Sequence, residues 1–282
     1  MTHPTPDPRP SSNDAIAFIG GGNMASAIIG GLCQRGLAPG QIQVVEPFAE
    51  QRARLAEQFQ IQALEAPGPS LARAGLVVWA VKPQTFREAA QQSRPHTGQA
   101  LHLSVAAGIR SETIAGWLGT ERVVRAMPNT PALVGLGQTG LFARPAATAA
   151  DRLAVERVVQ TTGEFLWLEQ EAQLDAVTAL SGSGPAYVFY FIEAMIQAGA
   201  DMGLSHAQAR QLAIGTFAGA TALAHQASEP PEVLRARVTS KGGTTHAALT
   251  CLEDGGVKAR FMQAMQAARR RAGALGDEFG AA

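Results

Sequence analysis

The spacing of apolar residues changes along the chain, and the change divides it into two parts. Up to residue 127, short apolar runs alternate with stretches whose apolar residues recur at helical spacing. The runs lie at 15–19, 42–46, 76–81, 101–106 and 123–127, and the helical stretches lie at 25–36, 50–59, 84–93 and 111–118. This alternation predicts a mostly parallel sheet whose strands are joined by crossover helices.

The second part of the chain is helical and rich in alanine. One more helix is expected at about 151–162, closed by Gly163, and an apolar run, FLWL, follows at 165–168. Beyond it we expect helices at 185–202, 205–226, 232–238, 244–253 and 257–275, the second opened by a capping box at Ser205-x-x-Gln208. The pattern predicts an α/β domain over 14–172, a helical domain over 173–282 and a proline-rich flexible tail at 1–13.

Charge and cysteine content narrow the class of protein. Lys and Arg (23) balance Asp and Glu (23), so no basic excess favours nucleic acid as a partner. Only 16% of residues are charged, and we therefore expect part of the surface to be buried in a subunit contact. No apolar run is long enough to span a membrane. Cys33 and Cys251 lie in no metal or disulfide spacing, which fits a reducing cytoplasm.

The segment Gly20-Gly21-Gly22-Asn23-Met24-Ala25 is a G-x-G-x-x-A loop between the first strand and the first helix. Such a loop turns tightly, lets a pyrophosphate approach the backbone and lets a small residue pack the helix on the sheet. Taken alone, the motif also fits a plain glycine turn. Glu46 ends the second strand about 20 residues later, where an acidic side chain meets the adenosine ribose. Because it repels a 2′-phosphate, we expect NADH use beside NADPH.

Three further strand ends carry candidate ligand contacts. Trp79-Ala80-Val81-Lys82-Pro83 ends one strand, although Lys82 also fits a solvated loop. Ala106-Ala107-Gly108 follows the next strand, and its small residues fit either a nicotinamide ring or a close-packed turn. Asn129, in Met127-Pro128-Asn129-Thr130-Pro131, is either a cofactor contact or a turn former.

The helical part contains two glycine-rich loops. Ser181 to Tyr187 reads SGSGPAY, a loop feeding a helix with Pro185 in its first turn. Ser240 to Thr245 reads SKGGTT and opens another helix, whose first N–H groups suit a small carboxylate. The alternative is that Thr244 or Thr245 simply caps this helix. His246 is interpreted as a surface histidine, and no metal-binding or G-x-S-x-G spacing is present in the sequence.

The motifs IAFIGGGNM, AVKP, SVAAG, MPNTP, DAVTALSGSGPAY and VTSKGGTT, in this order, closely resemble those of pyrroline-5-carboxylate reductase. The resemblance covers residues 14 to about 275. It implies an N-terminal Rossmann domain and a helical dimerisation domain that interlocks with a second subunit. It also implies a cytoplasmic homodimer or higher homo-oligomer that reduces 1-pyrroline-5-carboxylate to L-proline with NADPH, less often NADH, and that needs no metal.

The resemblance also assigns residues. It implies that Gly20, Gly22, Asn23 and Met24 hold the pyrophosphate, that Ala80, Val81, Lys82, Pro83, Ala106, Ala107 and Gly108 line the nicotinamide side, and that Glu171, Ser240, Gly243, Thr244 and Thr245 contact the substrate. Thr245 is the candidate catalytic residue. Lys241 stands where family members often have proline. The alternative functions are a related dehydrogenase of a small hydroxy acid and a non-catalytic dinucleotide sensor.

Overall fold

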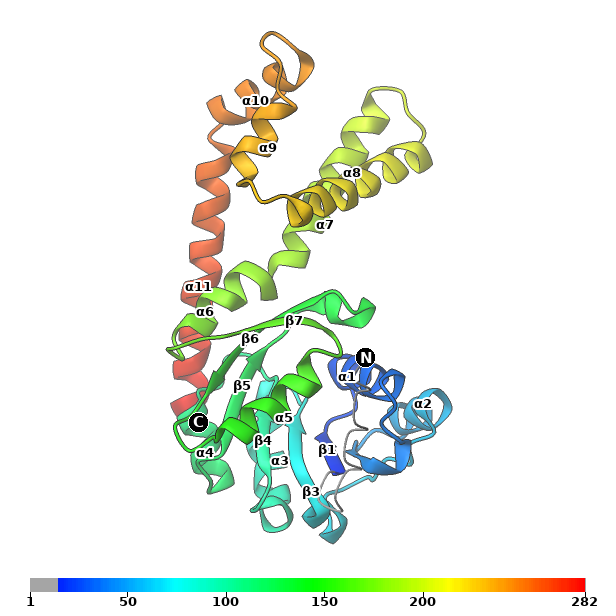
Figure 1. Ribbon diagram of the computed structural model, residues 1–282, viewed down its shortest axis with the longest axis vertical. Helices are drawn as coiled ribbons and strands as arrows, with labels where there is room; N and C mark the ends of the chain where they lie inside the picture. The colour runs from blue at the N-terminus through cyan, green and yellow to red at the C-terminus, as the bar shows by residue number, and fades with distance from the viewer. Residues whose placement is uncertain (1–14, 282) are drawn as a thin grey trace, which may run out of the picture. The chain divides into compact units, whose positions relative to one another are not determined.

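A seven-stranded sheet forms the first part of the chain (Figure 1). The computed structural model describes residues 15–281, so the predicted tail at 1–13 lies outside the described residues. The strands are β1 Ala15–Ile19, β2 Ile42–Val45, β3 Ala74–Trp79, β4 Leu101–Ser104, β5 Val123–Met127, β6 Gly137–Ala143 and β7 Gly163–Trp167. Their order is β2-β1-β3-β4-β5-β6-β7, and only the β5–β6 pair is antiparallel. The predicted mostly parallel sheet is confirmed.

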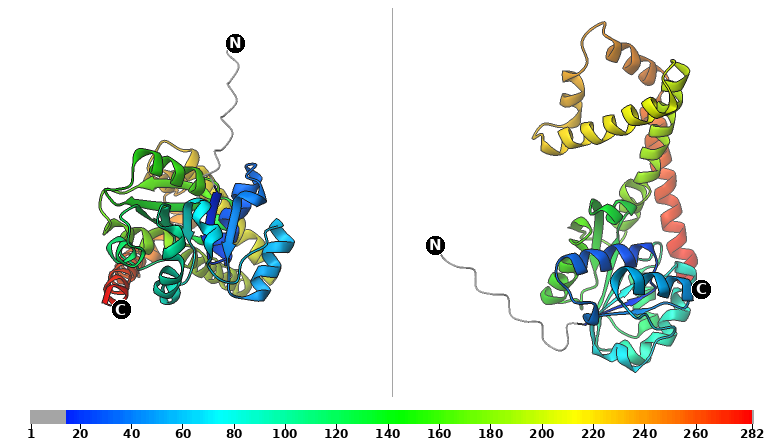
Figure 2. Two further views of the ribbon diagram at one scale, coloured as in Figure 1. Left: turned by 90° about the horizontal axis from the view of Figure 1, so that it is seen from below. Right: turned by 90° about the vertical axis from the view of Figure 1, so that its right-hand side faces the viewer.

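Helices cover both faces of this sheet (Figure 2). One face packs against α1 Asn23–Gln34, α2 Ala49–Phe59 and α5 Ala149–Val159. The other packs against α3 Pro83–Thr97 and α4 Ser111–Leu118. Phe18 faces the first layer, whereas Ala17 and Ile19 face the second, so β1 is apolar on both sides. A strand buried on both faces reads as a continuous apolar run, which is why its position was predictable.

The strand β6 was not predicted from the sequence. It contains two glycines, and close packing accounts for both, because a Cβ on Gly137 would lie 2.8 Å from Thr162 O and one on Gly140 2.9 Å from Val177 Cγ2. The prediction that Gly163 ends a helix is wrong. The helix α5 ends at Val159, and Gly163 is instead the first residue of β7, paired with Gly137.

Short helical segments complete this region. They are the 3₁₀ turns η1 Pro39–Gln41, η2 Pro69–Arg73 and η3 Thr130–Val134, the helix α6 Gln173–Val177 and the π-helical turn η4 Thr178–Gly182. The π-helical turn replaces the first part of the loop expected at 181–187. Gly182 packs closely there, since a Cβ would lie 2.5 Å from the terminal Cε of Met127.

Five helices follow: α7 Gly184–Asp201, α8 His206–Gln226, α9 Pro231–Arg237, α10 Thr244–Asp254 and α11 Val257–Ala281. The chain forms two compact units, one of residues up to Gly182 together with those from Arg269, the other Ser183–Ala268. The predicted domain boundary near residue 172 stays a prediction. The predicted capping box is confirmed, since Gln208 N–H donates to Ser205 Oγ and Ser205 N–H donates to Gln208 Oε1.

The unit Ser183–Ala268 buries few apolar side chains. On α7 and α8, the buried residues are Gly199, Ala209 and Ala213. Large apolar side chains on the same two helices are exposed, namely Val188, Phe189, Tyr190, Met195, Leu212, Ile214 and Leu223. Within the described residues, no helix has the length and apolar character that a membrane span requires. The exposed side chains form an apolar surface of the kind that marks an interaction site.

Candidate active site

The glycine-rich loop connects β1 to α1 and is fixed by its backbone. Gly20 N–H donates to Val45 O at 2.8 Å, and Gly20 has a φ of +94°. A Cβ on Gly20 would lie 2.6 Å from Ala80 O. Both the left-handed conformation and the close approach of β3 therefore require glycine at this position.

Gly22 differs from Gly20, because the fold itself does not require it. It is the N-cap of α1 with φ −70° and ψ −169°, which any residue adopts. A Cβ on Gly22 would have no protein atom within 4 Å. Asn23 is exposed and Met24 half-buried at the first turn, where the helix presents N–H groups without intrahelical partners. This open space in front of a helix N-terminus fits a phosphate group.

Glu46 lies at the end of β2, as predicted, and its side chain turns toward the glycine-rich loop. The Glu46 Oε2 atom accepts a hydrogen bond from Gly21 N–H at 2.8 Å, and Oε1 accepts one from Phe48 N–H at 3.0 Å. Only 6% of Glu46 is exposed. Gln51 was not predicted to take part, and its Nε2 donates to Gly21 O at 2.5 Å. The two side chains thus bind the two successive peptide groups that flank the Gly21 Cα atom.

The end of β3 lies beside the loop, since β1 and β3 pair in parallel. Ala80 and Val81 are half-buried, Lys82 is exposed, and Pro83 begins α3. Trp79 anchors this strand end through its Nε1–H, which donates to His102 Nδ1 at 3.0 Å. Burial lowers the pKa of His102 to about 4, so its imidazole is neutral and accepts this hydrogen bond.

The segment Ala106-Ala107-Gly108 follows β4, which pairs in parallel with β3. Gly108 has a φ of +78°, and a Cβ there would lie 3.0 Å from Leu275 Cβ. Leu275 and Phe279 belong to the last turns of α11, which pack on this segment. The close-packed turn is thus observed at Gly108, while Ala107 remains half-buried.

Asn129 makes two hydrogen bonds within the protein. Its Nδ2 donates to Ser181 O at 3.1 Å, and its Oδ1 accepts from Gln138 N–H at 2.9 Å. The side chain therefore joins the turn after β5 to β6 and to the π-helical turn.

Glu171 makes contacts that the sequence did not indicate. It accepts hydrogen bonds from the Ser111 N–H and hydroxyl at 2.6 and 2.7 Å, and from Arg125 Nη1 at 2.7 Å. Burial opposes its charge, but the bonds from Ser111 and Arg125 outweigh burial and lower the pKa of Glu171. Its carboxylate thereby caps the N-terminus of α4, and its predicted contact with substrate stays a prediction.

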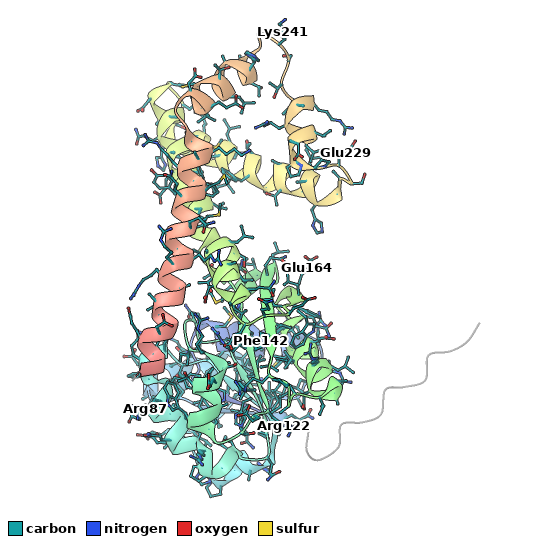
Figure 3. All side chains as sticks on the ribbon, turned by 90° about the vertical axis from the view of Figure 1, so that its left-hand side faces the viewer. Arg87, Arg122, Phe142, Glu164, Glu229 and Lys241 are labelled. Atoms are coloured by element: carbon teal, nitrogen blue, oxygen red, sulfur yellow. The ribbon has the colours of Figure 1, made fainter. Side chains whose placement is uncertain are left out.

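The segment Ser240–Thr245 forms the turn between α9 and α10. Gly243 N–H donates to Ser240 O at 3.0 Å, and Gly242 has a φ of +75°. The N-cap of α10 is Gly243, and it makes no side-chain cap bond. The alternative that Thr244 or Thr245 caps the helix is therefore wrong, because both lie inside its first turn. Lys241 is exposed and projects from this turn in Figure 3.

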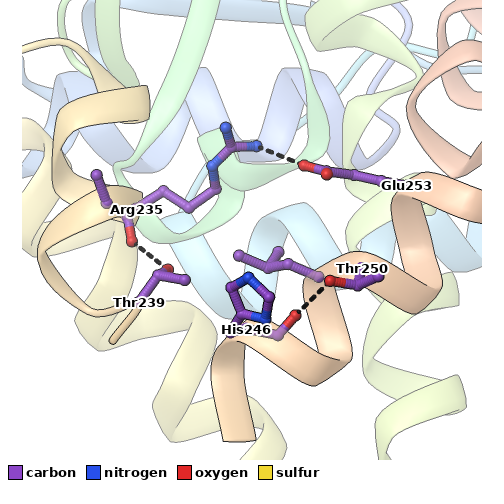
Figure 4. Close-up of a pocket in the computed structure, with 7 residues that line it drawn as sticks. Arg235, Thr239, His246, Thr250 and Glu253 are labelled. Atoms are coloured by element: carbon purple, nitrogen blue, oxygen red, sulfur yellow. Dashed lines mark hydrogen bonds and ion pairs between the residues drawn. The ribbon is translucent and has the colours of Figure 1, made fainter. Parts of the chain in front are cut away.

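A groove of about 280 Å³ lies between α9 and α10, next to this turn (Figure 4). Arg235 and Glu253 face each other across it, 3.9 Å apart. His246 is exposed at its edge, as the sequence indicated. Among residues 15–281, no group of three His, Cys, Asp or Glu side chains is arranged to hold a metal ion.

Comparison with known proteins connects both units to characterised families. Residues 171–275 match the family model described as pyrroline-5-carboxylate reductase dimerisation. Residues 15–108 match the model described as NADP oxidoreductase coenzyme F420-dependent. A pyrroline-5-carboxylate reductase of Pseudomonas aeruginosa is 43% identical over 271 residues, which are 95% of this chain and 99% of that protein.

Solved structures agree with the sequence relatives. The structure of a pyrroline-5-carboxylate reductase from Coxiella burnetii has a TM-score of 0.86 and 35% identity, covering 93% of this chain and 98% of that one. The Plasmodium falciparum pyrroline carboxylate reductase with NADP bound has a TM-score of 0.83 and 28% identity, covering 94% and 99%. The likeness thus extends over nearly the whole length of each chain.

Proposed function

The chain belongs to the pyrroline-5-carboxylate reductase family, and on that basis we propose which of its residues perform the reaction of the family. The protein reduces 1-pyrroline-5-carboxylate to L-proline with NADPH as the hydride donor, the last step of proline biosynthesis. One observation carries the assignment: the same chain contains both a dinucleotide-binding loop at Gly20–Gly22 and the dimerisation helices of the family.

We place the pyrophosphate of the cofactor at Gly20, Gly22, Asn23 and Met24. The open space at Gly22 supports this, because it leaves the first N–H groups of α1 accessible to a ligand. The first N–H groups of α1 and the helix dipole favour the negative charge. The segments Ala80–Pro83 and Ala106–Gly108 line the nicotinamide side, because the carboxyl ends of the neighbouring strands β1, β3 and β4 lie at one sheet edge.

We place the substrate at the start of α10. The N–H groups of Gly243, Thr244 and Thr245 suit its carboxylate, since a helix N-terminus attracts anions. The Thr245 hydroxyl orients the ring nitrogen, and Ser240 and Lys241 border the same turn. Glu171 is kept as a predicted substrate contact, beside its observed bonds to Ser111 and Arg125.

The chain needs to supply little acid–base chemistry. When bound, NADPH provides the hydride that reduces the imine carbon. An imine nitrogen is basic enough to be protonated near neutral pH, so a hydroxyl such as that of Thr245 suffices to hold it. The residues of the site therefore act mainly by positioning.

The protein is a homo-oligomer, since its helices from residue 171 form the family's dimerisation domain. We propose that the unit is a dimer in which α7 and α8 cover their exposed apolar side chains with those of a second copy. We also propose a cytoplasmic location, which the free thiols of Cys33 and Cys251 support.

Purified protein, fresh 1-pyrroline-5-carboxylate and NADPH test the function directly. We expect oxidation of NADPH that depends on the substrate, and formation of proline in equal amount. A parallel assay with NADH measures the cofactor preference. Absence of substrate-dependent oxidation with either cofactor would refute the proposal.

A further inference from the structure

The backbone of Gly21 is held on both sides by side chains from outside the glycine-rich loop. Glu46 Oε2 accepts a hydrogen bond from Gly21 N–H at 2.8 Å. Gln51 Nε2 donates a hydrogen bond to Gly21 O at 2.5 Å. Both residues come from the segment that follows β2. The two contacts bind the two ends of one residue, so they restrict its rotation on both sides.

Such restriction matters because Gly20, Gly21 and Gly22 are consecutive. Glycine has the largest backbone freedom of any residue, so ordering each one costs more conformational entropy than ordering any other residue. Gly20 is already fixed by its N–H bond to Val45 O. Gly21 is the residue that connects this fixed point to Gly22, the N-cap of α1.

Both carboxylate oxygens of Glu46 accept hydrogen bonds from the backbone of this region. The second oxygen accepts from Phe48 N–H at 3.0 Å, at the N-cap of α2. The residue is only 6% exposed. A side chain that recognises a ribose presents a carboxylate oxygen outward, whereas both oxygens of Glu46 face backbone N–H groups of the protein.

We propose that Glu46 and Gln51 are positioning residues that fix the two peptide groups flanking Gly21 and so preset the pyrophosphate cradle at Gly22. This inference rests on the proposed cofactor site at Gly20–Met24. A preset cradle binds more tightly, because the ordering cost is met before the cofactor arrives. The pyrophosphate is common to NADPH and NADH, so loss of either contact weakens both cofactors by the same factor.

The decisive variant is Glu46→Gln, which keeps the shape of the side chain and removes one acceptor. The new amide directs an NH₂ group at a backbone N–H, so one of the two hydrogen bonds is lost. We expect KM to rise about tenfold for NADPH and for NADH alike, which corresponds to about 1.4 kcal/mol. The kcat at saturating cofactor stays within about twofold of the parent, because the reacting groups are untouched.

Glu50→Gln is the matched control, since it makes the same change of charge on an exposed residue of α2. We expect its KM values to equal those of the parent. Gln51→Ala removes the other contact and is expected to raise both KM values about threefold, a smaller loss because a neutral bond is weaker than one to a carboxylate. If Glu46→Gln does not fold, the KM values of Gln51→Ala alone test the inference.

Three outcomes overturn the inference. The first is that the KM values of Glu46→Gln equal those of the parent, and the second is that KM changes for one cofactor alone, so that the ratio of the KM values for NADPH and NADH changes about fivefold or more. The third is that Glu50→Gln shows the same rise in KM. The second outcome would identify Glu46 as a ribose contact. Failure of the function itself is distinguishable, because the parent protein would then oxidise neither cofactor with 1-pyrroline-5-carboxylate.

Discussion

The substitution Gly22→Ala distinguishes what cofactor binding requires at this position from what the fold requires. The residue has an ordinary φ of −70°, and its Cβ would meet no protein atom within 4 Å. Glycine is moderately better than alanine at an N-cap, so Gly22→Ala costs about 1 kcal/mol of stability or less. For a chain of this size the melting temperature falls by only about 2–4 °C.

The same methyl group stands where we place the pyrophosphate. It keeps a phosphate oxygen from reaching the first N–H groups of α1 and removes one charge-assisted hydrogen bond or more, each contributing about 1.5–3 kcal/mol. At 1.4 kcal/mol per decade, we expect KM for NADPH to rise about 10- to 100-fold. Steady-state kinetics and thermal unfolding on the same preparation measure both quantities.

Gly20→Ala is the opposite case. Its φ of +94° and the 2.6 Å approach to Ala80 O make alanine strained. We expect a loss of about 2–4 kcal/mol of stability, seen as a large drop in melting temperature. An unchanged KM for NADPH in Gly22→Ala would refute the placement of the pyrophosphate. Equal stability of Gly20→Ala and the parent would refute the account of the turn.

Three further predictions concern the substrate, acid stability and assembly. Thr245→Ala is expected to lower kcat/KM about 10- to 100-fold with NADPH binding nearly intact, and Thr245→Ser to restore most of it; parental activity in both variants would contradict the substrate site. His102 has a folded pKa of about 4, below its unfolded value, so its neutral form stabilises the fold fully above about pH 6.5. That stabilisation, at most about 3 kcal/mol, is lost as the pH falls toward 4, and urea unfolding should show a weaker pH dependence over this range in His102→Gln. Light scattering at micromolar concentration should show a dimer or larger assembly, and a stable, active monomer would contradict the proposed interface of α7 and α8.

Strands with continuous apolar runs were predictable because burial on both faces leaves a plain signal, as at Ala15–Ile19. The strand β6 was not, because Gly140 is dictated by Val177, a neighbour in space and not in sequence. The position of Glu46 at the end of β2 was also predictable. The direction of its carboxylate was not, since it depends on the Gly21 N–H, 25 residues earlier.

The candidate substrate turn, Ser240–Thr245, was likewise predictable only in part. Its glycines and threonines marked a helix start, which the structure has at Thr244. Whether a threonine or a glycine occupies the N-cap depends on one residue of register. Sequence patterns fix helix ends no better than that.

The unit that carries the glycine-rich loop is discontinuous along the chain, because its last piece is the end of α11 from Arg269 onward. During synthesis, the ribosome makes the residues up to Gly182 first and then the whole of Ser183–Ala268 before that piece emerges. At about 5–20 residues per second this takes roughly 4–17 seconds. Until then Gly108 lacks its cover of Leu275 and Phe279. The nascent unit therefore keeps an apolar turn uncovered during this time, and its packing is completed only after the last turns of α11 have been made.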